Sequence, residues 1–167
     1  MHEGYLVTPI TKTELVLGLN GAGAIKAVMT GIVITVIGSL IAGVSTIFHA
    51  GSILGLLIMI VLTSLAFNSM MFLLMARVED PLVPRAMFGI LNTLLFFPSG
   101  SIYPVQAFPP WLRAIARVDP FTYAVHGFKS LLLKETGLSA IVPDMIYLSI
   151  FAAVTLAAAV PLFKRTL

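Results

Sequence analysis

Four long stretches of the chain contain no Asp, Glu, Lys, Arg or His, and they set its predicted architecture. These stretches cover residues 27–48, 50–76, 86–112 and 145–163. The first, second and fourth are apolar throughout, and each is long enough to cross a bilayer core of about 30 Å at about 1.5 Å per residue. Backbone groups inside a bilayer must satisfy their own hydrogen bonds, so we interpret these stretches as helices despite their many β-branched residues.

The third stretch is interrupted by prolines at positions 98, 104, 109 and 110. Because proline breaks a helix, only residues 86–102 are expected to form a continuous crossing. The predicted fold class is an all-α membrane protein with about four transmembrane helices, and with short re-entrant or interfacial helices between the third and the fourth. One transmembrane domain covers residues 1–167, and its expected spans are residues 24–47, 51–76, 86–102 and 144–163.

Composition supports this class and excludes several others. Hydrophobic residues make up 59% of the chain and charged residues 10%, with a mean hydropathy of +1.05. Soluble domains are about a quarter charged, so an ordinary water-soluble globular protein is excluded. The chain has no cysteine, which excludes disulfides, thiolate metal ligands and thiol nucleophiles.

Lysines and arginines predict the orientation of the spans. Four crossings place both chain ends on one side of the membrane, and the basic residues on that side are Lys12, Lys26, Arg77, Arg85, Lys164 and Arg165. Those expected on the other side are Arg113, Arg117, Lys129 and Lys134. Positive residues concentrate on the cytoplasmic side, so we expect cytoplasmic termini in a multi-pass protein of the cell (inner) membrane. We interpret the net charge of +3 as this topology signal and not as a nucleic-acid-binding surface.

The residues before the first span predict a short cytoplasmic helix with two alternative starts. Thr8 and Pro9 fit an N-cap followed by proline at the first helical position. Thr11 and Glu14 have the spacing of a capping box, which would start the helix slightly later. Such a helix either sets the entry angle of the first span or docks a soluble partner. Residues 1–13 lack the order of a secretory signal.

Two short helices are predicted in the extracytoplasmic loop of residues 103–143. The first follows a Pro-Pro pair, and the second follows Asp119 and Pro120, which fit an N-cap and a first helical residue. Neither is long enough to cross, so we expect interfacial or re-entrant helices with Trp111 and Tyr123 near the headgroups. In the second helix we expect an apolar stripe of Phe121, Val125, Phe128 and Leu132, and another face of His126, Lys129 and Ser130.

Sequence motifs for catalysis or metal binding do not occur. The chain has no Gly-Lys-Ser/Thr phosphate loop, no His-Glu-x-x-His and no Gly-x-Ser-x-Gly, and its 3 histidines are scattered. The four uncharged stretches hold no ionisable group at membrane depth, where membrane enzymes and ion-driven carriers usually place one. We therefore predict no catalytic, cofactor or metal-binding residues, and expect energy for uphill transport to come from outside the chain.

Polar and small residues in the spans predict helix contacts. Asn68 and Asn92 are candidates for polar lining of a path or for helix packing. Two stripes of small residues at helical spacing predict close approach of helices, within the monomer or at a dimer face. The stripes are Gly31, Thr35, Gly38 and Ala42, and Ser149, Ala153 and Ala157.

Three blocks of sequence follow one another in a recognisable order and spacing. The first reads EGYLVTPITKTELVLG, the second FPSGSIYPV, and the third PPWLRAIA followed by DPFTYAV. They resemble, in turn, the cytoplasmic loop, the end of the fifth helix and the extracellular re-entrant segment of type-2 ABC exporter permeases, the drug-resistance and polysaccharide-export kind. The likeness covers essentially the whole chain.

This resemblance implies a permease that pairs as a dimer and binds two cytoplasmic ATPase subunits or domains. Residues 1–22 would form the cytoplasmic coupling region, whose ATPase contacts are expected at Glu3, Tyr5, Leu6, Thr8 and Pro9. ATP and Mg²⁺ would be bound by that partner, so neither cofactors nor catalysis is expected on this chain. The extracytoplasmic re-entrant motif is expected at Pro98, Gly100, Pro104, Pro109, Trp111, Pro120 and Tyr123.

The four spans would correspond to the third to sixth helices of such a permease. The resemblance then places the first two helices upstream, so the chain would be a truncated reading frame, a shortened form or half of a split gene, and in the last case another chain would supply those helices. The other expected partners are a second permease protomer and the lipid bilayer. The predicted function is the membrane-spanning permease subunit of an ATP-driven ABC exporter, for a drug, a lipid-linked glycan or a lipid. The alternative is a non-transporting membrane scaffold or assembly subunit, or a truncated inactive permease fragment.

Overall fold

The computed structural model of the chain describes residues 11–44, 49–76, 78, 80, 82–134 and 137–162. These residues form α-helices and short 3-10 turns and contain no β-strand. Three helices in this part of the chain are long and apolar enough to cross a membrane. The predicted all-α membrane fold class is therefore confirmed.

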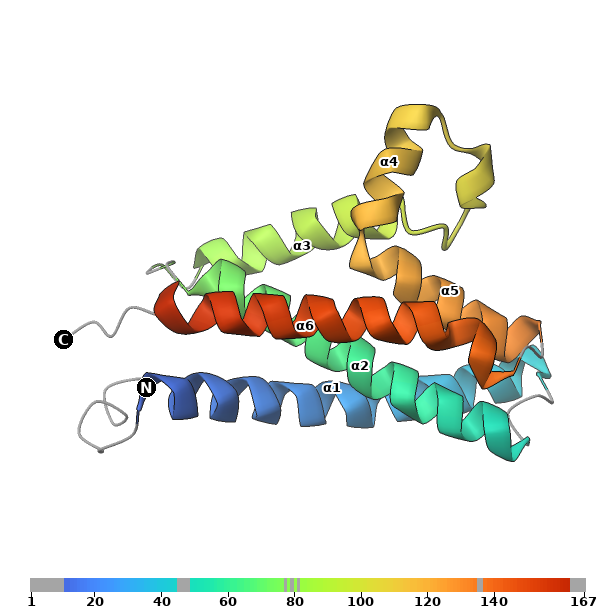
Figure 1. The fold of residues 1–167 in the computed structure, drawn as a ribbon, viewed down its shortest axis with the longest axis horizontal. Coiled ribbons are helices and arrows are strands. Elements are labelled where there is room, and N and C mark those ends of the chain that lie inside the picture. Colours follow the sequence, from blue (N-terminus) through green and yellow to red (C-terminus); the bar gives the residue numbers. More distant parts are fainter. Residues whose placement is uncertain are drawn as a thin grey trace.

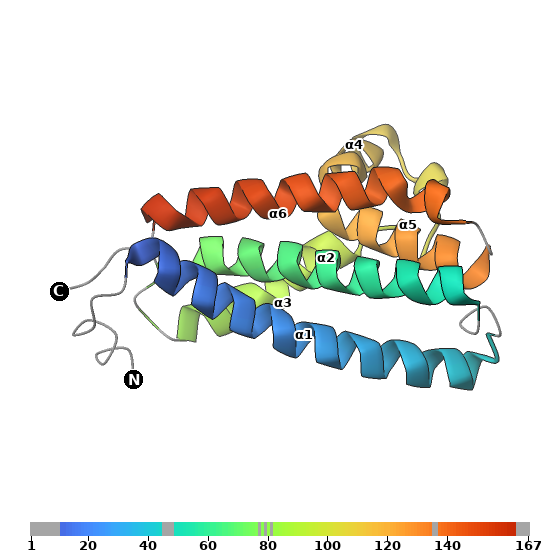
Figure 2. The ribbon, with the colours of Figure 1, turned by 60° about the horizontal axis from the view of Figure 1, so that its bottom comes forward.

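The three long helices form the body of the molecule. They are α1 (Lys12–Ala42), α2 (Ala50–Met75) and α6 (Val142–Leu162), and they run lengthwise along the molecule (Figure 1). In the view of Figure 2, α2 lies between α1 and α6. The start of α1 and the end of α6 lie at the same end of the molecule (Figure 1).

Both ends of α1 are fixed by capping groups. At its start, the Glu14 N–H donates to the Thr11 hydroxyl and the Thr11 N–H donates to the Glu14 carboxylate, which completes the predicted capping box. At its end, Gly43 adopts a left-handed conformation with φ of 66°, and the N–H groups of Gly43 and Val44 close the last turn. The alternative start at Thr8 and Pro9 lies outside the described residues. The helix is continuous through residues 22–24, where we expected the cytoplasmic region to give way to the first span.

Helix α3 (Leu82–Phe96) has 15 residues and therefore extends only about 22 Å. It begins where the Asp80 carboxylate accepts a hydrogen bond from the Leu82 N–H, and it ends just before Pro98. A residue that precedes proline is disfavoured in helical conformation, so the helix cannot pass Phe97. The crossing expected over residues 86–102 is thus helical only as far as Phe96.

The chain after α3 makes a loop with the 3-10 turn η3 (Val105–Ala107), and then helices α4 (Pro110–Val118) and α5 (Pro120–Leu133). Figure 1 shows α4 projecting sideways from the long helices, while α5 runs lengthwise along them. The 3-10 turn η4 (Leu138–Ile141) leads directly into α6. Both short helices predicted in this region are present.

The face that α5 buries differs from the predicted one. Its most buried residues are Pro120, Ala124, Gly127, Ser130 and Leu131. The predicted apolar stripe is only half-buried, and Ser130 lies inside although it was assigned to the polar face. The reason is that α5 packs closely on α2 and α6, where small residues fit best. A Cβ atom at Gly127 would clash with the end of the Met59 side chain.

An apolar core lies where α2, α5 and α6 meet. Its buried residues are Leu56, Met59, Ala66, Ala124, Leu131, Ile141, Leu148 and Ala152. Close approach of α5 to α2 depends on Gly55, where an added Cβ would lie 2.9 Å from methyl groups of Leu131 and Leu138. This core holds α5 against the long helices, and α5 in turn contacts α3.

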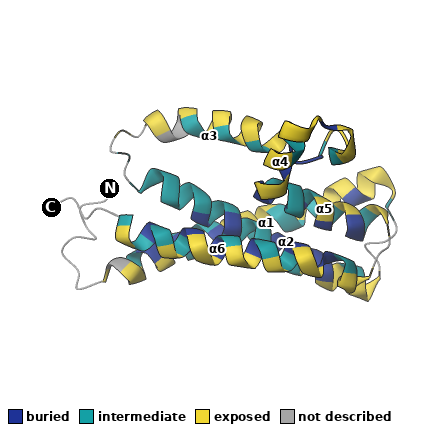
Figure 3. Ribbon diagram, turned by 45° about the horizontal axis from the view of Figure 1, so that its top comes forward, coloured by how far each residue is buried: buried dark blue, intermediate teal, exposed yellow. Residues whose placement is uncertain are grey.

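Figure 3 shows exposed residues along all the long helices, and many of the exposed residues are large and apolar, as expected for a surface that faces lipid. On α1 the exposed large apolar residues include Ile25, Met29, Val33, Ile37 and Ile41. The small residues predicted to form a stripe on α6, Ser149, Ala153 and Ala157, are also exposed. They therefore face away from the other helices, and packing inside the monomer does not use them.

Candidate functional site

Polar side chains join α1 to α2 near the start of α1. The Asn20 amide is 2% exposed, and its Nδ2 donates to the Ser69 hydroxyl over 2.9 Å. The Asn68 Nδ2 donates to the Asn20 backbone carbonyl over 2.7 Å. Gly23 leaves room for the Asn68 side chain, because a Cβ at Gly23 would lie 2.8 Å from its Oδ1. We call Asn20, Asn68 and Ser69 the asparagine clasp.

The two asparagines predicted to line a path or to pack thus have different roles. Asn68 is a packing residue of the asparagine clasp. Asn92 is exposed on α3, away from that clasp. Asn20 was missed by the sequence analysis, because it precedes the uncharged stretch and looked cytoplasmic. Asn20 lies among the glycines of α1, and small residues at helical spacing indicate close helix packing, so the sequence did contain a pattern that could have identified it.

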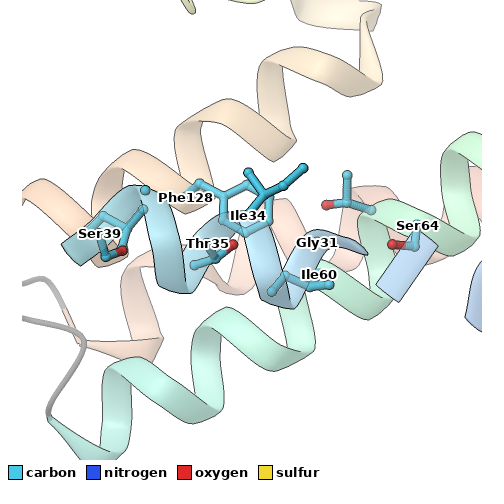
Figure 4. Close-up of a pocket in the computed structure, with 10 residues that line it drawn as sticks. Gly31, Ile34, Thr35, Ser39, Ile60, Ser64 and Phe128 are labelled. Atoms are coloured by element: carbon cyan, nitrogen blue, oxygen red, sulfur yellow. The ribbon is translucent and has the colours of Figure 1, made fainter. Parts of the chain in front are cut away.

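An apolar groove of about 420 Å³ lies among α1, α2 and α5 (Figure 4). Three of the predicted small residues, Gly31, Thr35 and Gly38, line it, so this stripe faces α2. A Cβ at Gly31 would lie 3.0 Å from the Ile60 Cγ2. The Thr63 hydroxyl is buried and has no hydrogen-bond partner among the described residues. The remaining lining residues are Ile34, Ser39, Ile60, Ser64, Phe128 and Leu132.

The loop that follows α3 is tied back to α5 by one lysine. The Lys129 Nζ donates to the carbonyl oxygens of Gly100 and Ser101, over 2.7 and 3.2 Å. Gly100 has φ of 77°, which other residues rarely adopt, and an added Cβ would lie 2.7 Å from the Val105 Cγ2. Pro98, Ser99 and Gly100 are buried, so this part of the predicted motif forms a fixed turn.

The same loop is closed on the α4 side by Arg113. Its Nη2 donates to the carbonyl oxygens of Gln106 and Phe108, over 2.9 and 3.1 Å. Pro109 stands at the N-cap of α4, and Trp111 is 66% exposed. An exposed tryptophan on a sideways helix suits the headgroup zone predicted for it.

Asp119 connects α4 to α5. Its carboxylate accepts a hydrogen bond from the Phe121 N–H over 2.9 Å, which confirms the predicted N-cap. Burial of this carboxyl raises its pKa to about 6, against the opposing effect of its hydrogen bonds to Phe121 and Thr122.

Two stacked tyrosines fix the end of α4. The ring centroids of Tyr123 and Tyr147 lie 3.8 Å apart, and the two ring planes are inclined by 15°. The Tyr123 hydroxyl donates to the Arg117 carbonyl over 2.8 Å, and the Tyr147 hydroxyl donates to the Val118 carbonyl. Tyr123, predicted for the headgroup zone, thus also links α4 to α5, while Tyr147 links α4 to α6.

A second cavity, of about 460 Å³, opens between the loop of residues 99–106 and α5. Among its polar lining residues are Gln106, Arg117, Thr122, Tyr123, His126, Lys129, Lys134 and Asp144. The His126 Nδ1 lies 2.8 Å from the Asp144 Oδ2, and Asp144 is 4% exposed. Neither residue was singled out by the sequence analysis as part of a site, because they are distant in sequence.

The structure brings together only part of the predicted residues. Gly100, Pro104 and Tyr123 line the second cavity, whereas Trp111 points outward on α4. The predicted ATPase contacts, Glu3, Tyr5, Leu6, Thr8 and Pro9, lie outside the described residues. Within the described part of the chain no group of three or more His, Cys, Asp or Glu residues is placed to hold a metal ion.

Comparison with known proteins identifies the family. The family model described as "ABC-2 family transporter protein" matches residues 1–160, which is nearly the whole chain. No curated protein sequence and no solved structure gives a match. Together with three helices suited to crossing a membrane, the match places the chain in this class. The chain belongs to the ABC-2 family of transporter proteins and is an integral membrane permease component of an ABC transporter.

Proposed function

We propose that this permease component serves an ATP-driven exporter, in which it forms the translocation path with a second protomer and couples to a separate cytoplasmic ATPase. Family membership carries this proposal, because it implies an ATPase partner and dimeric assembly in general. ATP and Mg²⁺ would be bound by the ATPase. The membrane chain would change conformation in response to the ATPase and would form the path through which the transported molecule crosses the membrane.

The absence of a coupling ion site in the sequence supports an external energy source. Residues 27–48, 50–76 and 145–163 contain no Asp, Glu, Lys, Arg or His. Carriers driven by protons or ions usually hold such groups at membrane depth. ATP hydrolysis on a partner would supply the energy for uphill transport.

The asparagine clasp supports a route for coupling. Helix α1 is continuous from Lys12 to Ala42, so its first turns and its membrane-crossing part belong to one helix. Asn20 and Asn68 join that element to α2. If the ATPase contacts residues 3–9, a conformational change in the ATPase would then displace α1 and α2 together.

The lining of the apolar groove indicates which class of molecule could be transported. Its walls are apolar, and the hydroxyl-bearing residues Thr35, Ser39, Thr63 and Ser64 line it. A site of this kind suits an amphipathic molecule with a large apolar part and a few hydrogen-bonding groups. We propose that it forms part of the path.

Co-purification from the native membrane in mild detergent, with mass spectrometry of everything that co-elutes, tests the assembly. We expect an ATPase with a phosphate-binding loop and a second permease protomer. If the chain elutes alone while known exporters keep their ATPases under identical conditions, the exporter proposal fails and the scaffold or inactive-fragment alternative is favoured.

Substitution in the N-terminal segment tests the coupling. Tyr5→Asp together with Leu6→Asp should lower substrate-stimulated ATP hydrolysis by about tenfold or more if these residues dock. Ser139→Asp introduces a charge at an exposed position of η4 and serves as the matched control. Unchanged, substrate-responsive hydrolysis in the double variant would show that the ATPase does not dock there.

A further inference from the structure

The cavity between the loop of residues 99–106 and α5 gathers more positive than negative charge. Arg117 comes from the last turn of α4, Lys129 from α5 and Lys134 from the end of α5. The one carboxylate in its lining is that of Asp144, which already lies against His126. We call this the basic cavity.

We propose that the basic cavity binds a phosphate group with net negative charge, carried either by an anionic lipid headgroup or by a soluble phosphate ester. This goes beyond the proposed export function and does not depend on the ATPase. The volume of about 460 Å³ falls in the range of about 300–1,000 Å³ that small-molecule sites occupy.

Charge balance is the first argument for an anionic ligand. Among the described residues, His126 and Asp144 form the only ion pair, so Arg117, Lys129 and Lys134 have no carboxylate partner there. Three basic side chains around one cavity create a positive potential that attracts anions. A bound phosphate would offset this potential.

Donor geometry is the second argument. Lys129 donates to the carbonyl oxygens of Gly100 and Ser101, so its ammonium is held at the cavity with a third N–H left to donate. His126 is three residues before Lys129 and therefore neighbours it on the same face of α5. The Arg117 guanidinium makes no hydrogen bond to the described residues, and its planar fork suits two oxygens of a phosphate.

The test uses the full chain, reconstituted in nanodiscs, and has two arms. In the soluble arm, glycerol 3-phosphate is titrated in zwitterionic phosphatidylcholine nanodiscs and the thermal unfolding temperature is followed. In the lipid arm, native mass spectrometry measures retention of phosphatidylglycerol against phosphatidylcholine. Binding in the first arm identifies a soluble ester as the source, and selective retention in the second identifies a lipid headgroup.

The decisive variant combines Arg117→Gln with Lys134→Gln, because the structure gives neither side chain a structural hydrogen bond to the described residues. We expect at least about tenfold weaker binding in whichever arm is positive, since each charged donor contributes strongly. Arg117→Lys keeps the charge but loses the planar fork, so it should bind more tightly than Arg117→Gln and more weakly than the unmodified chain. Lys26→Gln removes an exposed lysine of α1 and should change nothing.

Two results would overturn the proposal: no binding in either arm, or equal binding by the double variant and the unmodified chain. Unfolding temperatures without ligand show whether the double variant is folded. If it is not, the single variants Arg117→Gln and Arg117→Lys decide. A site that uses Arg117 requires Arg117→Gln to bind more weakly than Arg117→Lys, and equal binding by both contradicts it.

Discussion

The Asn20 side-chain amide donates a hydrogen bond to the Ser69 hydroxyl, 2.9 Å away, at a buried contact between α1 and α2. The hydroxyl in turn donates to the Leu65 carbonyl of its own helix. These bonds lie close to the start of α1, where the proposed coupling force would enter. The contact therefore joins α1 to α2 at the end that, under the proposed function, would face the ATPase.

The energetic asymmetry of buried hydrogen bonds predicts the effect of removing one partner. Ser69→Ala leaves the Asn20 amide buried without this partner and should destabilise the fold by about 1–3 kcal/mol. Adding Asn20→Leu removes the unpaired polar group and should recover part of that loss. Thermal unfolding of the single and double variants in detergent measures this. If Ser69→Ala is as stable as the unmodified chain, the contact is not a stabilising one.

The turn at Gly100 is predicted to require glycine. Gly100→Ala places a Cβ at a positive φ and against Val105, so we expect a loss of at least about 1 kcal/mol and a loosened loop. Faster protease cleavage within residues 97–108 would report the loosening. Gly89→Ala is the matched control, because a Cβ there meets nothing within 4 Å and the helix should gain slightly. Equal cleavage of both variants would contradict the requirement.

The raised pKa of Asp119 predicts a dependence of stability on pH. A carboxyl with a pKa of about 6 in the folded chain and about 3.9 unfolded holds its proton more tightly when folded. Its contribution is therefore fully present below about pH 4 and is lost as pH rises to about 6. Solvent screening reduces the effect to about 1–2 kcal/mol.

Asp119→Asn keeps a capping oxygen but cannot ionise, so it should flatten the stability profile between about pH 4 and pH 6. Unfolding temperatures across this range give the profile. Asp80→Asn, at the start of α3, is the control that changes a second capping carboxylate. A profile for Asp119→Asn with the slope of the unmodified chain would rule out this origin.

Filling the apolar groove is predicted to block transport without preventing assembly. Gly31→Leu would place a side chain against Ile60 and into the groove. We expect transport in reconstituted vesicles to fall about tenfold or more while the ATPase still co-purifies. Gly51→Leu, where an added Cβ meets nothing within 4 Å, is the matched control. Normal transport by Gly31→Leu would exclude the groove from the path.

Local features of the fold follow from the sequence because their partners are near in the chain. The capping box of Thr11 and Glu14 and the N-cap at Asp119 each join residues only two or three positions apart. Apolar length alone identified the three long helices, since a bilayer-spanning helix satisfies its own backbone. The family also followed from short blocks of residues in order, and the match over residues 1–160 confirms it.

Only the tertiary structure decided which polar groups meet. Asn20 and Ser69 are 49 positions apart, and His126 and Asp144 are 18 apart, so no local pattern predicts either contact. The buried face of α5 was also decided by packing, because close approach to α2 and α6 favours Gly127 and Ser130 over the larger residues of the apolar stripe. Sequence by itself determined the helices, through apolar length and capping, and the family, through three short blocks of residues in order. The basic cavity, the groove and the asparagine clasp exist only because the fold brings distant segments into contact.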